Sequence, residues 1–264
     1  MEISFPYLRR IVIRKVSLQT RVLELSRIDH GTPMLNESDK DWLKEKYPEL
    51  IIEPGRITGT IKFIGAYSVL LDEFWQIEKG VTPSKDAYIL GGSFLVRIQE
   101  EVGRRFPTLY LEDKKIEKKP DRHLNSNGAA CLFSPLEEDF ILPTSNFRIF
   151  FQELIIPFLY GQLFFDRKSH WPWQDYSHGP AGILESYFYS NGKIKPGDCL
   201  VELKKWEGWE YIKKILHQKK IRGHLTICFC PKRDYLRRCH SDAWKGIIKL
   251  HEDIIAQSVT IYFI

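Results

Sequence analysis

A cluster of metal-binding residue types near the C-terminus constrains the fold of this chain more than any other feature. Cys228, Cys230, Cys239 and His240 follow the pattern Cys-x-Cys, eight residues, Cys-His, all within thirteen residues. Zinc prefers four nitrogen or sulfur ligands around a tetrahedral centre, and a tight knuckle with a short return can supply them. Free thiols are the alternative, but four such residues at this spacing rarely coincide. We therefore expect a structural zinc ion in a closed site.

This pattern resembles the SEC-C zinc motif, which lies at the C-terminus of the SecA translocase. The four ligand positions match that motif. Inside the loop the chain departs from it, because the usual Gly-Ser-Gly after the second cysteine is Pro231-Lys232-Arg233 here. The resemblance implies a small zinc-binding C-terminal module, which we predict at residues 193–264.

A second informative stretch, His123–Leu132, carries a lone cysteine behind a glycine-containing loop. No other cysteine lies near Cys131, so neither a local disulfide nor a CxxC metal half-site explains it. A loop thiol beside polar groups can act as a nucleophile or carry an acyl group. Asn125 or Asn127 could donate an amide N–H to an oxyanion, and Gly128 allows a close turn past the sulfur. The alternative is a small buried cysteine at the end of a strand.

The elements around this loop resemble those of ubiquitin-conjugating enzymes, especially their bacterial relatives. That family has a helix, a four-strand antiparallel meander, a loop with histidine, asparagine, glycine and Cys-Leu, and following helices. The resemblance covers roughly residues 36–165 and implies an α+β fold. The expected helix is 37–47, with Asn36 or Ser38 as its N-cap. The expected strands are 56–64, 67–77, 88–98 and 106–111.

In that family the cysteine carries a ubiquitin-like modifier as a thioester. The resemblance therefore implies that Cys131 accepts the C-terminal carboxyl of such a modifier from an activating enzyme and passes it to an amine of a protein target. His123 would hold the loop, and an antiphage defence pathway is what the bacterial relatives suggest. The sequence contains neither GxxxxGK[ST] nor GxGxxG, so another protein must carry out the ATP-dependent activation.

The loop departs from the family pattern in its length. His123 lies eight residues and Asn125 six residues before Cys131, whereas the common eukaryotic spacings are ten and eight. Leu124 replaces the usual proline, and Asn125 and Asn127 both remain candidates for the oxyanion donor. Some family members bind ubiquitin-like proteins without catalysis, and a fold does not determine a function. A non-catalytic adaptor is therefore one alternative, and a nucleic-acid-binding zinc protein is another.

Basic residues concentrate around the predicted zinc module. The chain has a formal net charge of +5, but residues 203–240 hold eleven Lys/Arg against three Asp/Glu. Contact with an acidic partner or nucleic acid would explain this excess, and thiolate ligands would explain part of it, since basic neighbours favour them. Trp206 and Trp209 lie in the same segment, but together with Ile212 they have the spacing of a helical packing face. Nucleic acid is therefore not the expected partner.

The two remaining cysteines indicate a reducing compartment. Cys131 and Cys199 lie outside the metal motif, and we expect Cys199 to occupy a core position. Unpaired thiols beside a thiolate zinc site are typical of cytoplasmic proteins. The N-terminus lacks the long apolar run of a signal peptide. We therefore expect a cytoplasmic protein.

The most apolar segment of the chain is 147–165, which contains Pro157 and two charged residues. A membrane span needs about twenty predominantly apolar residues without such charges. We expect a buried helix instead, with Thr144 or Ser145 as its N-cap and Pro157 as its kink or end.

These predictions divide the chain into an N-terminal extension at 1–35, a ubiquitin-conjugating-like domain at 36–192 and the zinc module. The turn at 190–193 is the best boundary candidate, and a short helix is expected just before it, at 179–189. Within the extension, residues 9–28 fit either a strand pair or an amphipathic helix. His178 could border the thioester site, although a loop histidine without catalytic duty is the favoured interpretation.

Overall fold

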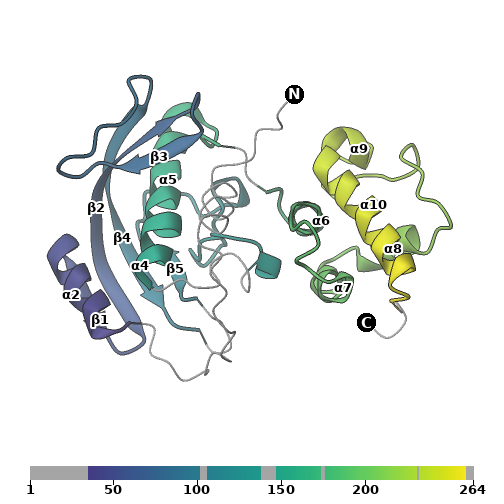
Figure 1. Ribbon diagram of the computed structural model, residues 1–264, viewed down its shortest axis with the longest axis horizontal. Helices are drawn as coiled ribbons and strands as arrows, with labels where there is room; N and C mark the ends of the chain where they lie inside the picture. Colours follow the sequence, from purple (N-terminus) through teal and green to yellow (C-terminus); the bar gives the residue numbers. More distant parts are fainter. Residues whose placement is uncertain (1–34, 102–105, 138–146, 174–175, 231, 260–264) are drawn as a thin grey trace, which may run out of the picture. The chain divides into compact units, whose positions relative to one another are not determined.

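The computed structural model describes residues 35–101, 106–137, 147–173, 176–230 and 232–259. These residues form two compact units (Figure 1). Of the described residues, 35–101, 106–132 and 147–173 form the N-terminal unit, and 133–137, 176–230 and 232–259 form the C-terminal unit. Residues 1–34 of the expected extension and both predicted N-cap residues, Thr144 and Ser145, lie outside the described residues.

Helix α2, Glu37–Lys46, begins the N-terminal unit at the predicted place. The side chain of Asn36, one of the two predicted N-caps, accepts a hydrogen bond from the Asp39 backbone N–H at 2.8 Å. This contact satisfies one of the donors that every helix leaves open at its start. Acidic residues occupy the first turn and basic residues the last, so charge favours the helix at both ends. Leu43 is completely buried, and α2 lies beside the first strand.

An antiparallel sheet forms the middle of the N-terminal unit and consists of β1 Leu50–Glu53, β2 Arg56–Ser68, β3 Glu73–Gln76, β4 Tyr88–Gln99 and β5 Thr108–Leu111. Four of these strands form a meander in the order β1-β2-β4-β5 (Figure 1). β3 lies off this path and pairs with the end of β2, on the same edge where β1 pairs with its start. Much of β2 and β4 alternates buried and exposed side chains, as strands with one covered face do.

An antiparallel meander is present, but it does not consist of the four predicted strands, because β2 pairs directly with β4 and β1 is the fourth strand of the path. β1 has four residues, too few for a readable pattern. The predicted strand 67–77 is wrong, because its first two residues end β2 and β3 begins only at Glu73. Between these strands Asp72 adopts a left-handed backbone with φ +50°, and the Tyr67 hydroxyl donates to the Asp72 carboxylate at 2.6 Å. Residues 69–71 are apolar, so the hydrophobic pattern of the sequence does not indicate this turn.

The apolar segment forms a helix, as predicted, but Pro157 does not end it. It consists of α4 Phe147–Phe150, the π-helical turn η3 Phe151–Ile155 and α5 Ile156–Lys168. Proline removes a backbone donor, and its ring crowds the preceding turn of an α-helix. The Ile156 N–H bonds to the Phe151 carbonyl, one residue further back than in an α-helix. This wider turn accommodates the proline ring, so the helix continues.

Helix α5 covers one face of the sheet (Figure 1). Glycines on the two central strands permit the close approach. A Cβ on Gly92 would lie 2.8 Å from the Leu163 side chain, and a Cβ on Gly65 would lie 2.9 Å from Tyr160. Among the described residues, the helix 147–168 is long and apolar enough to cross a membrane, but 67% of its most apolar window is buried. That burial is typical of a core helix.

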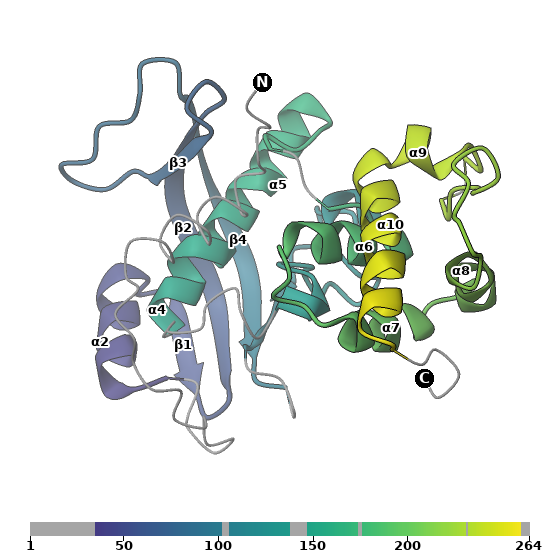
Figure 2. The same ribbon diagram turned by 45° about the vertical axis from the view of Figure 1, so that its right-hand side comes forward.

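The C-terminal unit consists of helices: the 3-10 turn η2 Pro135–Glu137, α6 Pro180–Tyr189, α7 Pro196–Lys204, α8 Trp209–Leu216, α9 Leu236–Cys239 and α10 Ser241–Ala256. Helices α6 and α10 pack against each other (Figure 2). Each of the five α-helices contributes a fully buried side chain to one apolar core, namely Leu184, Leu203, Ile212, Leu236 and Ile247. This core allows the unit to position the four predicted metal ligands, of which Cys239 is the last residue of α9.

The turn at 190–193 forms as predicted, with the Lys193 N–H donating to the Ser190 carbonyl at 3.1 Å. It does not separate the two units, because α6 before it and α7 after it both belong to the C-terminal unit. The units therefore differ from the predicted domains, whose boundary lies at 192. The physical reason is the apolar face of α6, whose Leu184 is buried in the C-terminal core.

Gly246→Ala is expected to destabilise the C-terminal unit by about 1–3 kcal/mol, the usual effect of overpacking. A Cβ on Gly246 would lie 2.0 Å from the Leu184 carbonyl oxygen, so α6 and α10 would have to separate. Gly197 in α7 is the matched control, because nothing lies within 4 Å of a Cβ there and alanine favours a helix. Thermal unfolding of both variants measures the difference, and equal melting temperatures would contradict the close packing.

Candidate functional site

A tight hairpin at residues 123–131, here called the thiol hairpin, carries the cysteine and both candidate asparagines. The Cys131 N–H donates to the His123 carbonyl at 2.8 Å, and the Asn125 N–H donates to the Ala129 carbonyl at 2.9 Å. These bonds pair the two arms of the hairpin. Cys131 therefore lies at the open end, and the Asn-Ser-Asn-Gly sequence forms the tip.

Gly128 fixes the thiol hairpin against strand β5. The Gly128 N–H donates to the Asn125 carbonyl at 2.8 Å, which closes the hairpin tip. The Gly128 carbonyl accepts a hydrogen bond from the Leu111 N–H at 2.9 Å. Its φ of +87° lies in the left-handed region, and a Cβ would lie 2.9 Å from the Leu111 carbonyl oxygen. The Ala130 N–H donates to the Leu109 carbonyl at 2.8 Å. The hairpin thus continues the sheet, which fixes the backbone that leads to the cysteine.

His123 packs at the base of the thiol hairpin. It follows the 3-10 turn η1, Pro120–Arg122, and has a left-handed φ of +50°. The residue is 8% exposed, and its ring meets Trp171 edge to face with 5.0 Å between centroids. The Trp171 indole N–H donates to the Asp121 carbonyl at 2.8 Å, an anchor that the sequence did not reveal. His178, the other histidine considered for this site, belongs to the C-terminal unit.

Cys131 is exposed, so the interpretation of a buried core thiol is wrong. The two exposed asparagines differ in their surroundings. The Asn127 side-chain oxygen accepts from the Ala129 N–H at 3.0 Å and caps the tip of the hairpin. Asn125 pairs with Ala129, which makes it a diagonal cross-strand neighbour of Cys131. Such neighbours lie about 7–8 Å apart, within reach of longer side chains.

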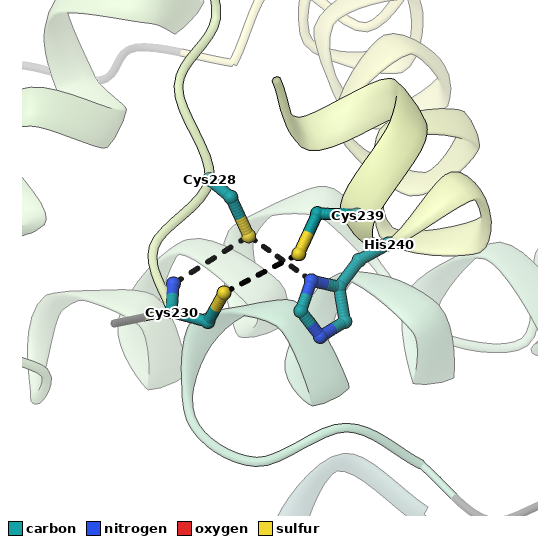
Figure 3. Close-up of side chains that lie close together, drawn as sticks. All are labelled: Cys228, Cys230, Cys239 and His240. Carbon is teal, nitrogen blue, oxygen red and sulfur yellow. Dashed lines mark hydrogen bonds between the residues drawn. The ribbon is translucent and has the colours of Figure 1, made fainter. Parts of the chain in front are cut away.

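The four predicted metal ligands meet at one point in the C-terminal unit (Figure 3). Their ligand atoms all lie within 4.8 Å of one another. Cys230 Sγ is 3.3 Å from Cys239 Sγ, and Cys228 Sγ is 3.0 Å from His240 Nδ1. Ligand atoms on a tetrahedral ion with metal–sulfur bonds of about 2.3 Å stand about 3.5–3.8 Å apart, which lies inside the observed range. This group of residues can bind a metal ion.

Backbone hydrogen bonds bring the two halves of the metal site together. An isolated bridge pairs Ile227 with Tyr235, and the Cys228 N–H donates to the Asp234 carbonyl at 2.7 Å. The short helix α9 starts directly after Tyr235 and carries the second pair of ligands back to the first. The eight residues between the two ligand pairs form a closed loop and one helical turn, and this path brings the second pair back to the first.

Burial disfavours charge on two of these ligands. Cys228 is 5% exposed, and burial raises the pKa of its thiol to about 12. Burial also lowers the pKa of His240, and the nearby Lys232 ammonium adds to this effect. A neutral imidazole is a good metal ligand, and a buried thiolate needs a neighbouring cation. The chemistry of the donor set therefore fits a bound cation.

Tyr211 on α8 supports residues 227–240, here called the metal loop, a contact that the sequence did not predict. Its hydroxyl accepts from the Ile227 N–H at 2.8 Å, next to the first ligand. The buried face of α8 contains Trp209 and Ile212, as the helical spacing predicts. Trp206 is 44% exposed and does not join that face, because it lies before the helix begins.

Comparison with known proteins does not identify a family. No family model matches the chain, and neither a curated protein nor a solved structure matches it. The thiol hairpin and the metal site are therefore the features of this chain that bear on its function.

Proposed function

We propose that this protein carries a ubiquitin-like modifier as a thioester on Cys131 and transfers it to an amine of a protein target. The thiol hairpin carries the proposal, because it holds an exposed cysteine on a fixed backbone with Asn125 on the adjacent arm. The order of helix, meander, cysteine hairpin and helix is also the order that the ubiquitin-conjugating family uses. An activating enzyme and the modifier are the partners that this function requires. A cytoplasmic conjugation pathway in bacterial antiphage defence is its proposed setting.

The proposed reaction has two acyl-transfer steps. In the first, the Cys131 thiolate attacks the thioester carbonyl that joins the modifier to the activating enzyme, and the thiolate of that enzyme leaves. In the second, an amine of the target attacks the new thioester, an amide forms, and Cys131 leaves with the proton that the amine gives up. Each step passes through a tetrahedral oxyanion, which a positioned amide N–H can stabilise.

Asn125→Ala is expected to leave charging of Cys131 intact and to slow discharge onto an amine by roughly 10²-fold, the scale of losing one oxyanion donor. We favour Asn125 because the Asn127 side chain already caps the hairpin tip. Single-turnover discharge of the preformed thioester onto free lysine measures the effect.

Two variants at the tip serve as controls for this prediction. Asn127→Ala removes one hydrogen bond and should lower stability by about 1 kcal/mol, with little effect on the discharge rate. Ser126→Ala changes an exposed tip residue and should leave both quantities unchanged. If Asn127→Ala alone slows discharge, the roles of the two asparagines are reversed. If neither Asn125→Ala nor Asn127→Ala slows it, no asparagine side chain of the hairpin stabilises the oxyanion.

We further propose that the metal is zinc and that its role is structural. Three thiolates and one imidazole form the kind of N/S ligand set that zinc prefers. The protein fills all four positions of a tetrahedral ion, so none remains for water or substrate. Bound zinc would hold the loop between Ile227 and His240 closed. The proposed thioester chemistry on Cys131 does not use the metal.

A further inference from the structure

Exposed cations lie in the metal loop of the C-terminal unit and on helix α8, which contacts that loop through Tyr211. Lys232 and Arg233 follow the second cysteine ligand, Arg237 and Arg238 lie on α9, and Lys214 lies on α8. We call these five exposed residues the knuckle cations. Within the part of the chain that the structure describes, no ion pair engages any of them.

Compensation of the thiolate ligands does not account for these cations. A closed site of Zn²⁺, three thiolates and a neutral imidazole carries one negative charge, and Asp234 adds a second. The four basic residues between 232 and 238 exceed these two negative charges by two, before Lys214 is considered. Because the cations are exposed, the excess positive potential extends into solvent, where it can attract an anionic partner.

Aromatic rings lie among the knuckle cations. Tyr211 is 38% exposed, and its ring meets Phe229 edge to face with 6.2 Å between centroids. The hydrogen bond from the Ile227 N–H to the Tyr211 hydroxyl, 2.8 Å long, fixes this ring against the metal loop. The Arg238 guanidinium lies over the Tyr235 ring, 5.5 Å from its centroid. Phe229 and Tyr235 thus lie within residues 227–240, Tyr211 is bonded to that segment, and four of the five knuckle cations belong to it.

We infer that the knuckle cations and these rings form a binding surface for single-stranded nucleic acid. Spaced cations neutralise phosphates, and partly exposed rings can stack on unpaired bases. An acidic protein would offer carboxylates to the cations but no bases to the rings, so the combination favours nucleic acid. The proposed surface does not include Cys131, so nucleic-acid binding would be a function additional to the proposed acyl transfer.

Fluorescence anisotropy of a labelled oligothymidylate of about 20 nucleotides tests this surface on the whole 264-residue chain. Binding should weaken as salt rises from about 50 to 200 mM, as counterion release requires. Lys232→Glu combined with Arg233→Glu should weaken binding at least about tenfold and reduce the salt slope by about 2, one for each phosphate that is no longer neutralised. Lys214→Glu, on α8 and apart from the ligands in sequence, should weaken binding about threefold, so the test stands even if the double variant loses its metal.

Lys114→Glu combined with Lys115→Glu is the matched control. Both lysines are exposed residues of the N-terminal unit, and the change in net charge is the same. This variant should bind within about twofold of the wild type. Equal losses in the two double variants would overturn the surface, because they would reveal only a net-charge effect. No binding by the wild-type chain at low salt would overturn it too. The surface would also be overturned if polyglutamate displaced the labelled oligothymidylate as effectively as unlabelled oligothymidylate does, because that result would indicate an acidic protein partner instead.

Discussion

Cys131→Ala is expected to abolish the thiol-labile adduct between this chain and a ubiquitin-like modifier. Alanine keeps the backbone N–H that donates to the His123 carbonyl, so the hairpin should persist without its nucleophile. The assay combines the chain with ATP, an activating enzyme and a modifier from the same source genome. Electrophoresis with and without a reducing thiol then detects the adduct. Cys131→Ser should give either no adduct or an oxyester that resists thiols.

Cys199→Ala is the matched control for this prediction. Cys199 is completely buried, and burial strongly raises the pKa of its thiol, so it is a poor nucleophile. The control variant should therefore keep the adduct. A thiol-labile adduct on the Cys131→Ala protein would contradict the assignment. A wild-type chain that binds the modifier but never forms an adduct would favour a non-catalytic adaptor.

Features that depend on neighbours along the chain could be predicted from the sequence. Asn36 caps α2 because its side chain reaches a backbone N–H three residues later. The helix predicted at 179–189 forms with Pro180 in its first turn, where the missing N–H is harmless. The grouping of the four candidate metal ligands could be predicted because each pair lies within three residues and one short loop returns between them.

Features that depend on distant residues could not be predicted in the same way. β1 is a strand because β2 offers it a partner, and its four residues carry no pattern alone. Pro157 is tolerated because the preceding turn widens, which no local rule specifies. Trp171 packs on His123 from a distant part of the chain. The two units differ from the predicted domains for the same reason: α6 packs its apolar side chains into the core of the C-terminal unit, and the sequence around α6 does not indicate that core.

Removal of the proposed zinc ion is expected to destabilise the C-terminal unit more than Gly246→Ala does. Structural zinc in zinc-finger peptides contributes about 10–16 kcal/mol at pH 7, and the helical core of this unit should reduce the loss to several kcal/mol. The purified chain should contain about one zinc ion per molecule. A chelator should lower the melting temperature and make Cys228, Cys230 and Cys239 reactive toward iodoacetamide. Cys228→Ser should reproduce the loss of stability, whereas Cys131→Ser should retain the metal.

Two histidine variants provide the sharpest control for this site. His240→Ala should lose the metal, because its Nδ1 atom lies 3.0 Å from Cys228 Sγ. His217→Ala should keep it, because the Nδ1 atom of His217 lies 2.7 Å from the Lys213 carbonyl oxygen and so faces the end of α8. A metal-free wild-type chain with unchanged melting would rule out the site. Charging of Cys131 should persist in a folded Cys228→Ser protein, since thioester formation uses no metal. Loss of charging there would mean that the two units are coupled and that zinc supports more than its own loop.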